Sequence, residues 1–229
     1  MFIIDTADGV FTERGIPALC DKVAARDPRL RRVVDEFGHP PFWDRPNTFE
    51  SFVWFILEQQ VSQASAKSAL EKLRERVGEI TPENVLALTD DELRAAYFSR
   101  QKTNYVRGLA QQVADGQLDF GELEKLPDSA VRDRLVRLKG VGNWTVDVYL
   151  IVALHRVDVF PSGDLGAVNG LKELAGLPRT TTAEELTAVA REWAPYRTIA
   201  TILLWHYYLS RRVGSTSPPG RPGRRGPVS

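Results

Sequence analysis

Apolar residues recur along most of the chain every three to four positions, which is the spacing of a helix with one buried face. Phe52, Phe55 and Ile56 follow this spacing in one segment, and Leu135 and Leu138 follow it in another. The two-residue alternation of a half-buried strand is nearly absent, and only residues 2–4 are expected to be extended. The pattern predicts an all-α protein of roughly ten helices.

Three short motifs mark helix starts. NTFE at 47–50, TDDE at 89–92 and TAEE at 182–185 each place an Asn or Thr three positions before a Glu. In a capping box, the first side chain accepts a hydrogen bond from the fourth backbone N–H, and the fourth side chain reaches back to the first N–H. We expect a helix to begin directly after the first residue of each motif.

The end of the chain differs from the rest. Residues 214–229, GSTSPPGRPGRRGPVS, are rich in proline and glycine and have no apolar period. Such a segment cannot bury enough apolar surface to fold, so we expect a disordered basic tail after a domain of residues 1–213. The last 19 residues carry five arginines and no acid, whereas the first 210 carry 25 basic and 30 acidic residues. Contact with a polyanion must therefore be local, because the body of the chain is acidic.

Composition excludes several classes of protein. Cys20 is the single cysteine of the sequence, so a disulfide framework and a four-cysteine zinc or iron–sulfur site are excluded. No apolar run approaches the roughly 20 residues that span a bilayer, and the N-terminus lacks the pattern of a signal peptide. We expect a chain without membrane contact in a reducing compartment, either the cytoplasm or, in a eukaryote, the nucleus.

A glycine-rich turn, LKGVGNW at 138–144, separates two helical segments. Gly140 and Gly142 permit a tight reversal because glycine adopts backbone angles that are closed to other residues. Backbone N–H groups at the start of the following helix can bind a phosphate, and the preceding RDRLVRLK supplies four basic residues. A simple connection between packed helices explains the two glycines equally well, so both interpretations stay open on this pattern alone.

Longer stretches carry a resemblance to a known family. LVRLKGVGNWTVDVYLIVAL at 135–154, followed by DVFPSGDLG at 158–166, resembles the helix-hairpin-helix DNA glycosylase superfamily. FESFVWFILEQQVS at 49–62, SRQKTNYVRGLA at 99–110 and WAPYRTIATILLW at 193–205 are similar to its 3-methyladenine DNA glycosylase II branch, in the same order. The resemblance implies a two-lobed helical fold with the active-site cleft between the lobes, in a compact form without a large N-terminal β-domain.

The resemblance implies that Asp164 is the catalytic carboxylate. Breaking a glycosidic bond builds positive charge on the sugar, and a nearby carboxylate stabilises that charge and orients or deprotonates the attacking water. Taken alone, Asp164 after PSG is typical of a helix cap. Asp158, between Val157 and Val159, is the fallback candidate.

Two tryptophans are implied to form the base pocket. Relatives that also cut the DNA strand carry a lysine two residues after the second hairpin glycine, and here that position is Trp144. An indole cannot form the imine of a lyase reaction, so the resemblance implies base hydrolysis without strand cleavage. Trp144 and Trp205 are implied to stack on an extruded base, with ordinary core packing as the alternative for each.

The resemblance also implies a DNA-binding set of Lys139, Gly140, Gly142 and Thr145 at the hairpin, with Gln60 filling the gap left by the extruded base. The best-known relatives carry leucine where this chain has Gln60, and a buried glutamine at a helix end is the alternative. A monovalent cation held by hairpin carbonyls is known in relatives, and no other cofactor is expected.

Several polar residues are not assigned to the reaction. Arg197 in PYR and His206 in WHYY are interpreted as an interhelical bridge and a core-edge imidazole. Glu58 interrupts an apolar helix, and nothing in the sequence explains it. Val146 and Val148 stand where relatives carry a small residue and a tyrosine, which weakens any transfer of substrate preference.

The sequence therefore predicts a monomeric, monofunctional N-glycosylase that flips out alkylated purines such as 3-methyladenine and 7-methylguanine from double-stranded DNA. These bases are cationic and leave readily, which fits a site with one obvious carboxylate. The alternatives are a glycosylase for oxidised, deaminated or uracil bases, and a non-catalytic helix-hairpin-helix DNA-binding module.

Overall fold

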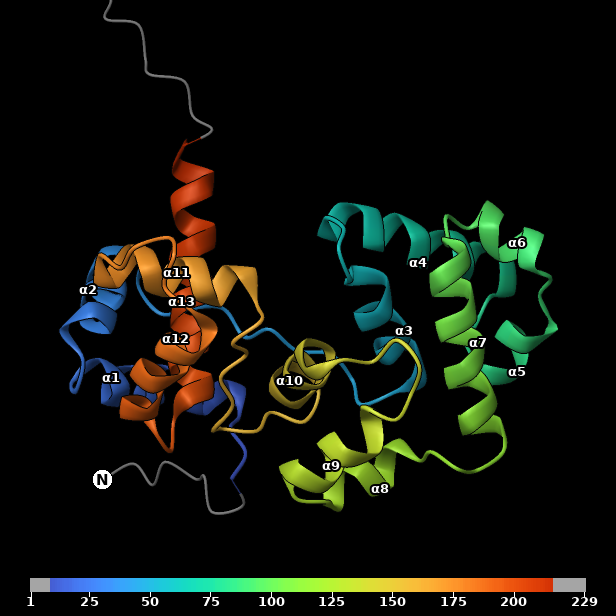
Figure 1. Ribbon diagram of the computed structural model, residues 1–229, viewed down its shortest axis with the longest axis horizontal. Coiled ribbons are helices and arrows are strands. Elements are labelled where there is room, and N and C mark those ends of the chain that lie inside the picture. The colour runs from blue at the N-terminus through green and yellow to red at the C-terminus, as the bar shows by residue number, and fades with distance from the viewer. Residues whose placement is uncertain (1–8, 216–229) are drawn as a thin grey trace, which may run out of the picture.

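The computed structural model describes residues 9–215, and these form two helical lobes (Figure 1). The first lobe contains α3 (Phe49–Glu58), α4 (Gln63–Val77), α5 (Pro82–Ala87), α6 (Asp90–Ala95), α7 (Arg100–Ala114), α8 (Phe120–Lys125), α9 (Asp128–Leu135) and α10 (Asn143–Val152). The second contains α1 (Ile16–Ala24), α2 (Pro28–Phe37), α11 (Leu165–Ala175), α12 (Ala183–Ala190), α13 (Arg197–Ser215) and the short 3-10 helices η1 (Glu13–Gly15) and η2 (Arg191–Trp193).

The all-α prediction is confirmed. Within residues 9–215 the extended pairing is limited to one isolated bridge between Val10 and Arg156. The helices outnumber the predicted ten because several, such as α5, α6 and α8, have only six residues. No helix of the described part is long and apolar enough to cross a membrane. The predicted extended piece at residues 2–4 lies outside the described residues.

Each lobe has its own hydrophobic core. Phe52, Phe55 and Tyr149 are buried together in the first lobe, where their rings meet edge to face. The second core gathers apolar residues of α1, α2, α11, α12 and α13, and includes Trp193, whose indole donates to the carboxylate of Asp27 at 2.7 Å. Two separate cores confirm the predicted two-lobed architecture.

The chain passes between the lobes twice. Residues 38–48 run from α2 to α3, and residues 153–164 return from α10 to α11. The first crossing segment contacts the end of α10, because the Arg45 N–H donates to the Val152 carbonyl at 3.1 Å. It also contacts the second crossing segment, because His155 lies 3.0 Å from the Asp44 carboxylate.

Two of the three predicted capping boxes are confirmed, at Thr89 and at Thr182. The first is wrong, because α3 is capped by Thr48, whose hydroxyl accepts from the Ser51 N–H. The side chain of Asn47 turns inward instead. Its amide donates to the Phe120 carbonyl at 2.9 Å, and its oxygen accepts from the Tyr149 hydroxyl at 2.7 Å.

The predicted boundary of the tail needs a correction. The helix α13 continues to Ser215, so the prediction of disorder from residue 214 is wrong for residues 214 and 215. The apolar period that marks the helix ends before its last turn, which is a common cause of errors at helix ends. Residues 216–229 lie outside the described part of the chain.

Candidate active site

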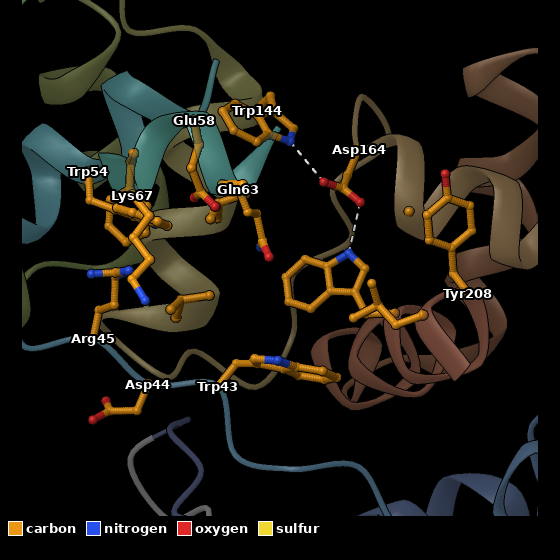
Figure 2. Close-up of a pocket in the computed structure, with 17 residues that line it drawn as sticks. Trp43, Asp44, Arg45, Trp54, Glu58, Gln63, Lys67, Trp144, Asp164 and Tyr208 are labelled. Atoms are coloured by element: carbon orange, nitrogen blue, oxygen red, sulfur yellow. Dashed lines mark hydrogen bonds between the residues drawn. The ribbon is translucent and has the colours of Figure 1, made fainter. Parts of the chain in front are cut away.

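Asp164 lies at the start of α11, where its side chain holds three hydrogen bonds. Oδ1 accepts from the Ala167 N–H at 2.9 Å, so Asp164 is the helix cap that the PSGD pattern predicts. The same carboxylate accepts from the indole of Trp144 through Oδ2 at 2.9 Å and from the indole of Trp205 through Oδ1 at 2.8 Å (Figure 2). The donors come from α10, α11 and α13, so three helices fix the orientation of one carboxylate.

Gly166 makes the approach of Trp205 to this carboxylate feasible. A Cβ added at Gly166 would lie 3.1 Å from Cδ1 of Trp205 and 3.2 Å from Oδ1 of Asp164. Both contacts are tighter than ordinary packing allows. The glycine two residues after Asp164 therefore supports the indole–carboxylate bond.

Asp164 faces a cavity of about 520 Å³ between the two lobes. This size lies within the range of small-molecule pockets. The lining is mainly aromatic and apolar and includes several charged or polar side chains: Trp43, Asp44, Arg45, Trp54, Phe55, Glu58, Gln63, Ala64, Lys67, Trp144, Val148, Val152, Asp164, Gly166, Trp205, Tyr208 and Leu209. The structure thus brings the three pocket residues expected from the sequence, Trp144, Asp164 and Trp205, to one cavity.

Glu58 also lines the cavity, although no role for it was expected from the sequence. It is the last residue of α3, and in Figure 2 its carboxyl group points into the cavity from the wall opposite Asp164. Burial raises the pKa of Glu58, and the charge of Asp164 acts in the same direction. The charge of Arg45 and polar contacts with Trp54 and Gln63 oppose that rise. The signal in the sequence was an acidic residue, Glu58, directly after the apolar residues 55–57.

Arg45 belongs to the first crossing segment and lies over an aromatic ring. Its guanidinium carbon is 3.9 Å from the centroid of the Trp54 ring, which is the geometry of a cation–π contact. Trp54 lies one turn before Glu58 on α3. The wall opposite Asp164 therefore combines one carboxyl group, one guanidinium and an indole.

The hairpin glycines differ from each other. Gly140 has φ +87°, and an added Cβ would overlap the Tyr105 ring, so glycine is required there on two grounds. Gly142 has φ −102° and ψ 178°, which any residue adopts, and no atom of the described chain lies within 4 Å of an added Cβ. The prediction of special backbone angles is right for Gly140 and wrong for Gly142, which instead leaves open space at the surface.

Gln59, which the sequence did not single out, ties the hairpin to α3. Its amide donates to the Gly140 carbonyl at 2.8 Å and to the Thr145 hydroxyl at 3.0 Å. Thr145 is only 1% exposed, so its side chain faces the protein interior. Lys139 is exposed beside the turn, and Gly142 caps α10 without a side-chain hydrogen bond.

Gln60 directly follows Gln59 and is exposed, with φ +59°. The alternative of a buried glutamine at a helix end is therefore wrong. A second hollow lies beside this turn and is lined in part by Leu57, Val61 and Tyr97. Tyr97 has φ +67° and is 64% exposed, which makes it an apolar surface feature near Gln60 that the sequence did not indicate.

Three hairpin carbonyls already accept hydrogen bonds from the protein: that of Gly140 from Gln59, that of Leu138 from the Val141 N–H at 3.1 Å, and that of Gly142 from the Val146 N–H at 3.2 Å. A monovalent cation at this turn stays a prediction and would have to use the other carbonyls. Among the residues that the structure describes, no group of three His, Cys, Asp or Glu side chains is arranged to hold a metal ion.

The remaining polar candidates have structural partners. Arg197 binds both carboxylate oxygens of Asp158, at 2.7 and 2.9 Å, and neither residue lines the cavity between the lobes. The interpretation of Arg197 as a bridge is confirmed, although it joins α13 to a crossing segment. His206 lies 3.1 Å from the Phe37 carbonyl and meets the Phe37 ring edge to face, as expected of a core-edge imidazole.

Two curated relatives are similar to this chain in sequence. DNA-3-methyladenine glycosylase 1 of Schizosaccharomyces pombe is 27% identical over 198 residues, which cover 85% of this chain and 86% of the relative. DNA-3-methyladenine glycosylase of Bacillus subtilis is 26% identical over 196 residues, covering 80% of this chain and 65% of the relative. The match thus spans less than two thirds of the length of the Bacillus protein.

Solved structures share the fold. The crystal structure of a DNA-3-methyladenine glycosidase from Bacillus halodurans is 32% identical, with a TM-score of 0.73 and coverage of 85% of this chain and 91% of that chain. An 8-oxoguanine glycosylase/lyase from Clostridium acetobutylicum, solved with double-stranded DNA, has a TM-score of 0.73 over 86% of this chain and 70% of that chain, but only 16% identity. The latter match therefore concerns the fold alone.

The family model described as HhH-GPD superfamily base excision DNA repair protein matches residues 53–196. This region includes Glu58, the hairpin and Asp164, and ends just before α13. The match covers more than half of the chain, and the chain belongs to the HhH-GPD superfamily of base excision DNA repair proteins.

Proposed function

We propose that this protein is a DNA glycosylase that hydrolytically excises alkylated purines from double-stranded DNA and leaves the strand intact. The observation that carries the proposal is the Asp164 carboxylate, which three hydrogen-bond donors hold at the wall of an aromatic cavity between the lobes. Relatives named DNA-3-methyladenine glycosylase support the choice of alkylated purines.

The cavity provides a place for one extruded base. A base inside a duplex is inaccessible, so an enzyme of this kind must rotate it out of the stack into a pocket. Trp43, Trp144 and Trp205 line the cavity with aromatic rings, and the Trp54 ring is covered by Arg45. An alkylated purine is electron-poor and often cationic, so stacking and cation–π attraction bind it more strongly than an undamaged base.

Asp164 then acts at the sugar. As the bond between C1′ and the base nitrogen breaks, its electrons leave with the base and positive charge develops on the sugar ring. A fixed carboxylate stabilises that charge and orients a water molecule, whose oxygen bonds to C1′ as the carboxylate takes up one of its protons. The hydrogen bonds from Trp144, Trp205 and Ala167 hold the charge in place before the reaction, which reduces the reorganisation that the transition state requires.

The hairpin supplies the contact to the DNA backbone. The uncapped start of α10 and the open space beside Gly142 suit a phosphate oxygen that accepts from backbone N–H groups. Lys139 adds a mobile positive charge at the same edge. Gln60 is exposed on a turn that Gln59 ties to the hairpin, which supports its role as the residue that enters the duplex.

The absence of strand cleavage rests on Trp144, which stands where lyases of the superfamily carry their lysine. Lys67 is the lysine among the cavity-lining residues, and its ammonium lies 3.7 Å from Glu71. We expect product DNA to contain abasic sites that break only on later alkali treatment, and borohydride to trap no protein–DNA adduct. A trapped adduct that disappears in Lys67→Gln would contradict the hydrolytic mechanism.

The experiment that tests the function is excision from matched duplexes that carry 3-methyladenine, 7-methylguanine, hypoxanthine, uracil or 8-oxoguanine. The methylated purines should be released fastest. Faster release of uracil or 8-oxoguanine would assign the protein to another damaged base. If no lesion yields an abasic site, the chain is a DNA-binding module without glycosylase activity.

A further inference from the structure

The wall of the cavity opposite Asp164 carries a carboxyl group that the chemistry at the sugar does not use. Glu58 ends α3, and its carboxyl group and the amide of Gln63 both point into the cavity (Figure 2). Because the guanidinium of Arg45 lies over the Trp54 ring, Arg45 faces an indole and acts on Glu58 through its charge. Glu58 is therefore a polar group aimed at whatever occupies the cavity.

The placement of Asp164 determines which part of a substrate would meet Glu58. If Asp164 acts at C1′ of the sugar, the base extends from C1′ into the cavity and towards the opposite wall. The edge of a purine farthest from its glycosidic nitrogen carries N–H donors, which are the exocyclic amine of adenine and the ring N–H of guanine. Methylation at N3 or N7 adds positive charge to the base and makes these N–H groups stronger donors.

We propose that Glu58 is a specificity-determining residue that accepts a hydrogen bond from the far edge of the extruded base and so favours cationic purines with an N–H donor there. The inference rests on the proposed function, because Asp164 must hold the sugar end. A hydrogen bond between a carboxylate and a charged donor is stronger than one between neutral groups. The second carboxylate therefore discriminates by charge, in addition to the stacking on the aromatic walls.

An ionised Glu58 is not favoured by the protein alone. Burial and the charge of Asp164 both raise its pKa, and the charge of Arg45 together with hydrogen bonds from Trp54 and Gln63 compensates only in part. A cationic base brings the missing positive charge into the cavity. Perturbed acids in a pocket of this kind are more often kept for binding or catalysis than for stability.

The test is a binding experiment, since binding reports on the base independently of its excision. Three duplexes are compared by fluorescence anisotropy: one with 7-methylguanine and one with 1,N6-ethenoadenine, each on a 2′-fluoro sugar that resists cleavage, and one with an abasic analogue. Ethenoadenine has no N–H at its far edge, and the abasic analogue has no base. The variant Glu58→Gln keeps the shape of the side chain and removes its charge.

We expect Glu58→Gln to weaken binding of the 7-methylguanine duplex about 10- to 100-fold, the range of a hydrogen bond to a charged group. Binding of the other two duplexes should change less than about twofold. The matched control is Glu75→Gln, which makes the same change on an exposed residue of α4 outside the cavity and should leave all three affinities unchanged.

An equal loss on all three duplexes would show that Glu58 only supports the fold, and unchanged binding of the 7-methylguanine duplex would show that it does not meet the base. Either result overturns the inference. Excision of 7-methylguanine from ordinary duplex is measured separately with the wild-type protein. Failure there would refute the proposed function even if the binding selectivity of Glu58 were observed, so the two failures are distinguishable.

Discussion

Asp164 and Glu58, which lie on opposite walls of the cavity, are held in different ways. Asp164 accepts hydrogen bonds from two indoles and one backbone N–H, so its negative charge is surrounded by donors. Glu58 ends an apolar helix, where burial raises its pKa more than Arg45, Trp54 and Gln63 lower it. Fixed donors thus surround the carboxylate at one end of the cavity, whereas burial outweighs the donors at the other.

This difference fits the two ends of the substrate, because the sugar and the base carry positive charge at different stages of the reaction. The sugar becomes positively charged only in the transition state, so a charge that acts there must be fixed in advance. The base is already positively charged when it arrives, so it can itself stabilise the charge of Glu58. The contrast predicts that substitutions at the two walls change different measured quantities.

The largest expected effect belongs to Asp164→Asn, which removes the charge at the sugar end. We expect excision of hypoxanthine, a poor leaving group, to slow by roughly 10²–10³-fold in single-turnover assays, as for loss of one electrostatic contact in a transition state. The asparagine oxygen can still accept from one indole, so the fold and binding of abasic-analogue duplex should persist. Excision close to the wild-type rate would show that Asp164 takes no part in the reaction. The contrast between the two walls would then be wrong as well.

The indole bonds to Asp164 are the next test, because two of them converge on this one carboxylate. Trp144→Phe and Trp205→Phe keep an aromatic ring and remove the N–H donor. Each should slow excision about tenfold, the lower range for a hydrogen bond to a charged group. Trp43→Phe is the matched control, since Trp43 lines the same cavity and no indole bond from it to Asp164 is observed. Equal losses in all three variants would mean that ring size matters and the N–H groups do not.

Substitutions in the hairpin test how the protein binds the DNA backbone, independently of the two cavity walls. Gly142→Ala meets no neighbouring atom and needs no unusual φ, so it should fold normally. We expect it to weaken lesioned and undamaged duplexes alike, by several-fold, because phosphate contacts position a protein without reading bases. Gly140→Ala collides with Tyr105 and should instead lower the melting temperature.

Circular dichroism gives the folding control, and anisotropy across a salt series gives the affinity. Lys139→Ala should make the log–log salt dependence shallower by about one unit if this lysine neutralises one phosphate. If a folded Gly142→Ala protein binds DNA with wild-type affinity, the hairpin only connects two helices and does not bind a phosphate.

Whether a feature could be predicted from the sequence depends on how many positions along the chain separate the residues that interact. Helices, the cap at Asp164 and the turn at Gly140 depend on neighbours within a few positions, so local patterns indicate them. The misassigned cap at Asn47 was decided by Tyr149, 102 positions away. Gln59 meets Gly140 across 81 positions. No local pattern can indicate that Glu58 faces Asp164, because the two residues come from different lobes and face each other only in the folded structure.

The smallest expected effect concerns the stability that the wild-type protein loses through Glu58. The pKa of Glu58 is raised above its ordinary value of 4.5, so the folded state binds this proton more tightly than the unfolded state does. Stability from this group is therefore complete below about pH 4.5 and declines as the pH rises through the folded pKa. Glu58→Gln removes the ionisation and should raise the melting temperature at pH 8 but not at pH 4.

We expect a gain at pH 8 of about 2–4 °C, which corresponds to about 1 kcal/mol in a chain of this size. Glu75→Gln, on an exposed glutamate that pairs with Lys72, should give no pH-dependent difference, because surface ion pairs contribute little. The measurement is thermal unfolding of both variants at the two pH values without DNA. A lower melting temperature for Glu58→Gln at pH 8 would mean that Arg45 and Gln63 fully stabilise the carboxylate. Both walls would then hold preorganised anions, and the cationic base would not be needed to stabilise the second one.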